Sequence, residues 1–166
     1  VITAVKGQAV NFSDESSTSF TISEAVKYVD VLMKHELKNA LIDLDIHMLV
    51  DPSISIKGNI NSFVQVLNNM ISNAIQAYNG KQNQKIDFTI DRKGNDIQFS
   101  IQDYGSGIPD SVQDKLFKEM ITTKGKNGTG LGLFMSYSNI RAHFNGNITF
   151  ESKEGFGTKF IISIPA

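Results

Sequence analysis

Two pairs of alternating segments constrain the fold of this chain more than any other feature. In the first pair, residues 86–90 and 97–101 place Ile or Phe at every second position, and the turn-forming sequence RKGND separates them. In the second pair, NITFES and TKFIISI lie on either side of the glycine-containing sequence KEGFG. A period of two puts alternate side chains on opposite faces of a strand, so each pair predicts a β-hairpin with one buried face.

One more strand and several helices are predicted around these hairpins. IDLDIHM, residues 42–48, alternates strictly and predicts a half-buried strand, and SFTI is a short strand candidate. Thr21 and Glu24 form a capping-box pattern that predicts the start of a helix. Apolar residues at helical spacing predict helices over about 23–40, 59–79 and 130–144. The combination predicts an α+β fold, a two-layer α/β sandwich in which a mixed, mostly antiparallel sheet of about five strands carries three main helices on one face.

The composition suits one compact globular domain. The chain has 166 residues, and its 16 Lys and Arg against 17 Asp and Glu give no indication of a nucleic-acid partner or of membrane contact. The absence of cysteine excludes disulfides and thiolate metal sites. No apolar segment is long enough to span a bilayer, and no signal peptide is found. Because the chain begins with Val1, we expect a fragment of a longer protein, with a linker over 1–17 and one domain over 18–166.

The first motif that could carry chemistry is NNMISNAIQA, within the second predicted helix. Asn69 and Asn73 lie one turn apart on the same edge of that helix, and Gln65 and Gln76 share the edge. A carboxamide oxygen is a hard, neutral ligand that suits magnesium beside phosphate oxygens. A plain polar border of an amphipathic helix would look the same.

The second motif is DYGSGIP, which follows the strand predicted over 97–101. Its carboxylate, Asp103, could accept a hydrogen bond from an exocyclic amino group such as that of adenine. Gly105 and Gly107 would let the backbone approach a flat ring closely. A simple turn at the end of a strand is the alternative. A calcium loop is rejected, because glycines stand where oxygen ligands would be needed.

The third motif is NGTGLGLFMS, in which Gly128, Gly130 and Gly132 lead into a predicted helix. Free backbone N–H groups at a helix start can bind anions. The spacing matches neither a P-loop nor a dinucleotide-binding turn, and for this motif taken alone a flexible turn is the better explanation.

Together and in this order, the three motifs resemble the N, G1 and G2 boxes of the GHKL superfamily. LFKEMITTKG resembles the F box and ATP lid, and EGFGTKFIISIP resembles the closing hairpin of histidine kinase ATP-binding domains. The resemblance covers about residues 18–166 and implies the Bergerat-type ATP-binding fold. It also implies that residues 1–17 could be the remnant of a preceding helical dimerisation domain.

The resemblance implies a role for each matching residue. Asn73 would bind Mg²⁺, and Asn69 would assist at the metal or the phosphates. Asp103 would hold the adenine amino group, and Lys124 would be the lid cation for the terminal phosphate, so that Asn69 and Lys124 are the predicted catalytic residues. The predicted ATP site consists of Asn69, Asn73, Ala77, Asp103, Gly105, Gly107, Ile108, Thr123, Lys124, Gly128, Thr129, Gly130, Leu131, Gly132 and Thr158.

The chain departs from the family pattern at a few positions. Phe117 matches the first F-box phenylalanine, but Met120 stands at the second. Ala77 stands where many relatives carry an aromatic beside adenine, and Gln76 where many carry a phosphate-contacting lysine. The departures at Ala77 and Gln76 make Lys124 more important to the predicted site, whereas the one at Met120 affects the packing of the lid.

The resemblance implies the catalytic domain of a sensor histidine kinase in the cytoplasm. It would transfer the γ-phosphoryl group of Mg-ATP to a histidine on a separate dimerisation domain of a homodimer, and a response regulator would be the next partner. ATPase modules of the superfamily are an alternative, but they place a glutamate where this chain has Asn69, which cannot act as a general base. The related serine kinases also favour an acid there, and a regulatory domain that binds nucleotide without catalysis is a further alternative.

A second sequence, MKHELKNAL, resembles the box that carries the phosphorylated histidine of these kinases. We predict that His35 is not the phosphate carrier, because it lies opposite the apolar stripe of Val26, Val29, Met33, Leu37 and Ala40. Ala40 replaces the proline of the family box, and a strand follows at once instead of the second helix of a hairpin. We therefore expect the isolated chain to bind ATP without phosphorylating itself.

Overall fold

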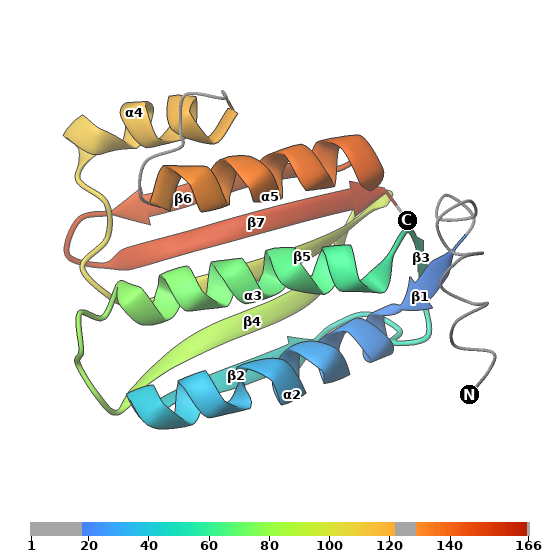
Figure 1. The fold of residues 1–166 in the computed structure, drawn as a ribbon, viewed down its shortest axis with the longest axis horizontal. Coiled ribbons are helices and arrows are strands. Elements are labelled where there is room, and N and C mark those ends of the chain that lie inside the picture. Colours follow the sequence, from blue (N-terminus) through green and yellow to red (C-terminus); the bar gives the residue numbers. More distant parts are fainter. Residues whose placement is uncertain (1–17, 122–128, 166) are drawn as a thin grey trace.

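The structure, a computed structural model, describes residues 18–121 and 129–165. Its main sheet has five strands in the order β2-β4-β5-β7-β6 (Figure 1). The strands are β2 (Ile42–Met48), β4 (Gln84–Lys93), β5 (Asp96–Asp103), β6 (Asn147–Lys153) and β7 (Gly157–Pro165). β2 runs parallel to β4, and the other neighbours are antiparallel. The predicted mixed, mostly antiparallel sheet is confirmed.

Both predicted hairpins are present. Ile90 of β4 lies opposite Phe99 of β5, so the apolar positions of the two strands share a face. Gly94 stands in the turn between them with a φ of 62°, a conformation that favours glycine. In the second hairpin, Phe150 of β6 lies opposite Phe160 of β7.

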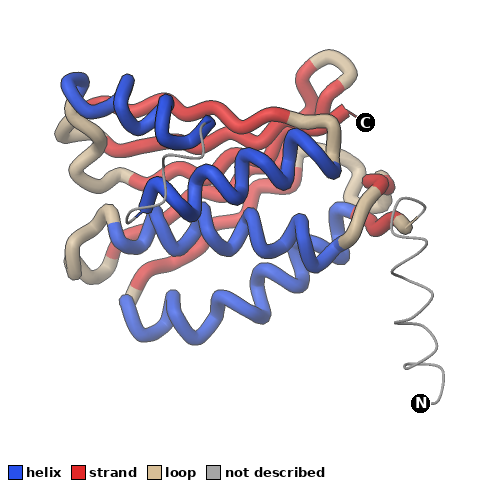
Figure 2. The backbone as a smooth tube through the Cα atoms, turned by 45° about the horizontal axis from the view of Figure 1, so that its top comes forward, coloured by secondary structure: helices blue, strands red, loops and turns tan. Residues whose placement is uncertain are grey.

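Three helices cover one face of the sheet, and a fourth lies beside them (Figures 1 and 2). They are α2 (Ile22–Ala40), α3 (Ile60–Gln76), α5 (Thr129–His143) and α4 (Asp110–Ile121). The predicted capping box starts α2, where Thr21 Oγ1 accepts from the Glu24 backbone N–H at 3.1 Å. The side chain of Asn59 caps α3 in the same way. The predicted α/β sandwich is confirmed.

The sequence patterns missed two elements. α4 was missed because its apolar pattern is weak: Leu116 packs against the core, whereas Val112 and Phe117 are exposed. The other missed element is β3 (Ser55–Lys57), which is too short to show a period; it pairs with β1 (Ser19–Thr21), the short strand predicted at SFTI. Helix α3 also ends earlier than predicted, because Asn79 and Gly80 adopt positive φ values of 52° and 85°.

The core lies between the helices and the sheet. Phe63 of α3 is fully buried, and its ring centroid lies 5.4 Å from Phe20, 4.9 Å from Phe99 and 5.2 Å from Phe144. One aromatic side chain thus joins β1, β5 and the end of α5 to α3. Within the described part of the chain, no helix has the length and hydropathy needed to cross a membrane.

Helix α2 places His35 on its exposed side, as predicted. The ring Nε2 lies 3.1 Å from Asn39 Nδ2, one turn further along the helix. The buried residues of α2 are Ile22, Ala25, Val29, Met33 and Leu37. Val26 and Ala40, which were expected on the apolar face, are only partly buried because they border this stripe.

Candidate functional site

The predicted site segments meet at one end of the sheet. Figure 1 shows that the end of α3, the start of α5, the end of β5 and the turn between β6 and β7 all lie at this end. Segments that are far apart in the sequence therefore come together at one end of the sheet. The centre of that region is the carboxylate at the end of β5.

Asp103 is the last residue of β5 and is only 3% exposed. Its Oδ1 accepts hydrogen bonds from the backbone N–H of Gly105 at 2.9 Å and of Thr158 at 3.3 Å. Among the residues that the structure describes, no group donates to Oδ2. Burial raises the pKa of Asp103, because desolvation penalises the ionised form and the two backbone hydrogen bonds offset it only in part. The side chain is thus held by one oxygen, and the other is free of donors in the described part of the chain.

The loop after Asp103 is packed too tightly for side chains at its glycines. A Cβ atom on Gly105 would lie 2.5 Å from the carbonyl oxygen of Ala77, at the end of α3. The Ser106 N–H also donates to this oxygen at 3.5 Å. Gly107 has a φ of 72°, and a Cβ there would collide with the carbonyl oxygen of Lys153. The loop therefore packs backbone against backbone, at the end of α3 and at the end of β6.

A polar network fixes the far end of this loop. The Ser152 hydroxyl accepts from the Ile108 N–H at 2.8 Å and lies 2.8 Å from Thr158 Oγ1. Gln113 of α4 donates to the carbonyl oxygens of Ile108 at 2.7 Å and Ser152 at 3.0 Å. Of the predicted residues, Thr158 thus contacts Asp103 directly and Ile108 is linked to Thr158 through Ser152, whereas Ser152 and Gln113 were missed. Neither has a sequence signal, because a polar residue on a strand or a helix normally faces solvent.

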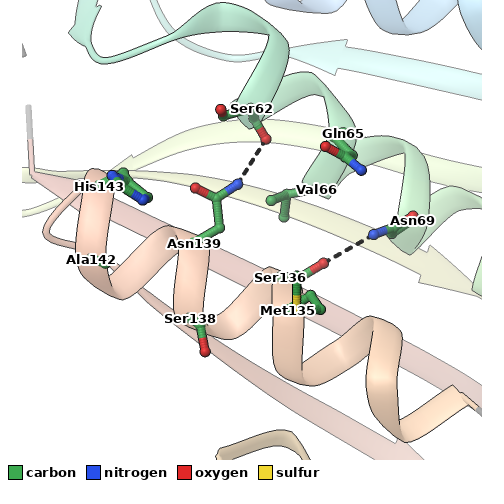
Figure 3. Close-up of a pocket in the computed structure, with 10 residues that line it drawn as sticks. All are labelled: Ser62, Gln65, Val66, Asn69, Met135, Ser136, Ser138, Asn139, Ala142 and His143. Atoms are coloured by element: carbon green, nitrogen blue, oxygen red, sulfur yellow. Dashed lines mark hydrogen bonds between the residues drawn. The ribbon is translucent and has the colours of Figure 1, made fainter. Parts of the chain in front are cut away.

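On α3, Asn69 and Asn73 lie one turn apart, and both are half-buried. Asn69 Nδ2 donates to the Ser136 hydroxyl of α5 at 3.3 Å (Figure 3), and Ser136 is only 2% exposed. This bond engages the amide nitrogen of Asn69 and leaves its oxygen for another partner.

A groove of about 350 Å³ continues from Asn69 between α3 and α5 (Figure 3). Its lining is mostly amide and hydroxyl side chains, including Gln65 and Ser138. Asn139 Nδ2 links the two helices by donating to the Ser62 carbonyl at 3.0 Å, and the lining continues past it to His143 (Figure 3). Gln76, the other predicted member of the polar edge, is exposed.

The two asparagines fit a magnesium ion that also binds phosphate. In the described ranges, no cluster of three or more His, Cys, Asp or Glu side chains could hold a metal. Carboxamide oxygens are suitable magnesium ligands when phosphate oxygens complete the shell. Asn69, with its nitrogen already bonded, and Asn73, one turn away, meet this requirement.

The structure describes some of the predicted lid residues. Thr123, Lys124 and Gly128 lie outside the described residues. Thr129, Gly130, Leu131 and Gly132 form the first turn of α5, where backbone N–H groups have no partner within the helix. Phe117 lies on α4 and is 43% exposed.

Tyr78 is a buried residue of this region that the sequence analysis missed. It follows α3 directly, is 4% exposed, and accepts a hydrogen bond from the backbone N–H of Tyr104 at 2.8 Å. In the sequence, Tyr78 is an aromatic residue near the end of a predicted helix, and that feature alone predicts only a packing role.

The comparisons with known proteins agree with this geometry. A family model described as histidine kinase-, DNA gyrase B- and HSP90-like ATPase matches residues 58–166. The sensor protein DegM of Bacillus sp. (strain B21-2) is 29% identical over 151 residues, which are 91% of this chain and 39% of DegM. The sensor protein SrrB of Staphylococcus aureus (strain NCTC 8325 / PS 47) is 45% identical over 53 residues, 31% of this chain and 9% of SrrB. The chain thus spans about two fifths, or less, of the length of these curated relatives.

Two solved structures extend the comparison. The nucleotide-free catalytic domain of the histidine kinase ThkA is 30% identical, with a TM-score of 0.73, and the match covers 89% of this chain and 94% of that domain. ThkA in complex with the response regulator protein TrrA matches with 28% identity and a TM-score of 0.71, over 89% of this chain and 41% of that one.

Proposed function

The chain belongs to the family of histidine kinase-, DNA gyrase B- and HSP90-like ATPases, and from this premise we propose that it binds Mg-ATP and transfers the γ-phosphoryl group to a histidine of a separate helical domain. The resemblance to sensor histidine kinase catalytic domains, which the sequence motifs predicted, is confirmed by the matches to ThkA and DegM. ATP is the nucleotide that the family implies.

One observation carries the proposal. The carboxylate of Asp103 is buried and held through Oδ1 alone, and the two glycines that follow it pack against the backbone of Ala77 and Lys153. Oδ2 has no donor among the described residues, so this oxygen can accept a hydrogen bond from a ligand. The exocyclic amino group of adenine is such a donor.

The phosphates would then extend from Asp103 towards α3 and the start of α5. Asn73 and Asn69 would hold Mg²⁺ through their amide oxygens, and the bound ion would offset the negative charge of the phosphates. The free backbone N–H groups at the start of α5, with Lys124, would hold the phosphate oxygens.

In the reaction, a nitrogen of the acceptor imidazole attacks the γ-phosphorus. The bond from that phosphorus to the bridging oxygen breaks, the new P–N bond forms, ADP leaves, and the imidazole releases its N–H proton. This transfer depends mainly on position and charge neutralisation. An imidazole is already nucleophilic, so the site requires no general base.

The hydrolytic alternative is supported less well. Activation of water needs a general base near the terminal phosphate. Asn69 stands where ATPase relatives carry glutamate, and its amide is bonded to Ser136. A carboxamide cannot accept the proton, which favours transfer to a histidine over hydrolysis.

The partners follow from the same proposal. ThkA has been solved in complex with the response regulator TrrA, and we expect a receiver domain of that kind to take the phosphoryl group from this kinase. The acceptor histidine would lie on a helical domain that dimerises, and the whole assembly would be cytoplasmic.

The first prediction concerns the acceptor. This chain and its His35→Gln variant should both stay unlabelled after incubation with radiolabelled ATP and Mg²⁺, because His35 lies on the exposed side of α2, which a strand follows at once instead of the second helix of a hairpin. Addition of the helical domain should produce an acid-labile, base-stable label on that domain alone. A label on the chain that disappears in the variant would show that His35 is the acceptor.

The second prediction concerns the metal. Asn73→Ala should weaken Mg-ATP binding by roughly tenfold or more, and should change binding of metal-free ATP much less, because the lost oxygen is a metal ligand. Calorimetric titration with and without Mg²⁺ measures both. Asn61→Ala, an exposed asparagine at the other end of α3, is the matched control. Equal losses in both titrations would rule out metal binding by Asn73.

A further inference from the structure

The hydroxyl of Tyr78 connects three elements at the adenine end of the site. It donates to the carbonyl oxygen of Lys85, at the start of β4, at 2.5 Å. It accepts from the backbone N–H of Tyr104, just after the end of β5, at 2.8 Å. Tyr78 itself follows α3 and is buried. One oxygen atom therefore joins the end of a helix to the two strands beneath it.

The side chain of Tyr104 is held by separate contacts, with residues of β4. Its hydroxyl donates to Asp87 of β4, and Lys85 Nζ lies 3.6 Å from the same carboxylate and 5.5 Å from the centroid of the Tyr104 ring. The hydrogen bond to Asp87 raises the pKa of Tyr104 to about 12, so this phenol stays protonated at neutral pH. Tyr104 is thus fixed at both its side chain and its backbone.

The backbone attachment has a consequence for Asp103. The Tyr104 N–H belongs to the peptide group that joins Asp103 to Tyr104, so the Tyr78 hydroxyl sets the orientation of that planar group. This orientation helps to determine where the Asp103 carboxylate points. The bonds from Gly105 and Thr158 then hold Oδ1, and Oδ2 has no donor among the described residues.

We propose that Tyr78 is a positioning residue that aims the free oxygen of Asp103 at the exocyclic amino group of a purine. This inference rests on the proposed function, because it requires Asp103 to recognise adenine. The ring of Tyr78 fills space that phenylalanine would fill equally well. The hydroxyl is the part that matters, since no other described group accepts from the Tyr104 N–H.

The test compares two nucleotides in two proteins. ATP carries the exocyclic amino group, and purine riboside triphosphate lacks it. We expect Tyr78→Phe to weaken ATP binding by about tenfold and to change binding of the analogue by less than about twofold, because only the amino group contacts Asp103. The matched control is Tyr137→Phe, which removes a hydroxyl that has no hydrogen bond among the described residues and should leave both affinities unchanged.

A purely structural role would give a different result, because it would weaken both nucleotides equally. Equal losses, or none, would overturn the proposal. A second measurement uses the unaltered chain, in case the variant does not fold: ATP should slow hydrogen exchange at the Tyr104 amide about fivefold more than the analogue does. Equal protection by the two nucleotides would also overturn it.

Failure of the proposed function has its own signature. If substitution of Asp103 leaves ATP affinity unchanged, the adenine site and the role of Tyr78 are both wrong. If Asp103 is required and the Tyr78 variant keeps its full preference for ATP over the analogue, only the role of Tyr78 is wrong.

Discussion

Replacing Asp103 with asparagine is expected to weaken ATP binding by roughly 10- to 150-fold, which corresponds to about 1.5–3 kcal/mol. Asparagine has nearly the same shape, and its oxygen can still accept from Gly105 and Thr158. Its amide nitrogen, a donor, would then face the adenine amino group, which is also a donor. In the unaltered protein the amino group faces a charged acceptor, the Asp103 carboxylate.

The same variant should be more stable than the unaltered protein at neutral pH. The pKa of Asp103 is raised by burial, so the folded state binds this proton more tightly than the unfolded state does. The stability that comes from protonation is fully present below the unfolded pKa, and it is lost as pH rises through the folded pKa. At neutral pH the folded protein therefore holds a buried charge at a cost, which the neutral asparagine does not have.

Two measurements on the Asp103→Asn variant check this pair of effects. Calorimetry gives the ATP affinity, and urea unfolding at several pH values gives the free energy of unfolding. The stability advantage should shrink as pH falls through the folded pKa of Asp103. Asp43→Asn, an exposed carboxylate of β2, is the control and should change neither quantity. A variant that binds ATP normally would contradict the adenine assignment.

Replacing Phe63 with alanine is expected to lower the free energy of unfolding by about 3–5 kcal/mol. The ring is fully buried, and three other phenylalanine rings pack against it. Because these rings come from β1, β5 and the end of α5, the cavity would lie where the helix layer and both sheets meet. The structure around it could not close the cavity without moving several elements.

Urea unfolding followed by circular dichroism measures this loss. Phe156→Ala is the control, since Phe156 is 66% exposed in the turn between β6 and β7, with Lys153 Nζ 4.7 Å from its ring centroid. Its loss should be below about 1 kcal/mol. A loss below about 1.5 kcal/mol for Phe63→Ala would show that the core rearranges around the missing ring.

Much of the fold was predictable because it depends on local periodicity. The alternation at residues 86–101 specified a hairpin, and the structure places Ile90 opposite Phe99 with both side chains buried. The capping box of Thr21 and Glu24 located the start of α2. The position of Asp103 at the end of a strand, followed by two glycines, could also be read from the chain. Each of these features depends on residues that are close together in the sequence.

Other features were decided by contacts between segments that are distant in the sequence. Helix α4 has a weak apolar pattern, and the polar side chain of Gln113 attaches its start to the β6 strand through Ser152. The amide of Asn69 is oriented by Ser136 of another helix. Such pairs leave no period in the sequence, because each partner is an ordinary polar residue until the fold brings it into contact.

The sequence by itself determined the sheet, the three main helices, the family and the chemical types of the site residues. The tertiary structure alone decided which oxygen of Asp103 is left free, why Gly105 can carry no side chain against Ala77, and how the Tyr78 hydroxyl joins α3 to the end of β5. The physical reason is that burial, close approach and hydrogen-bond geometry depend on distances in space, and the chain specifies these distances only when all its elements pack together.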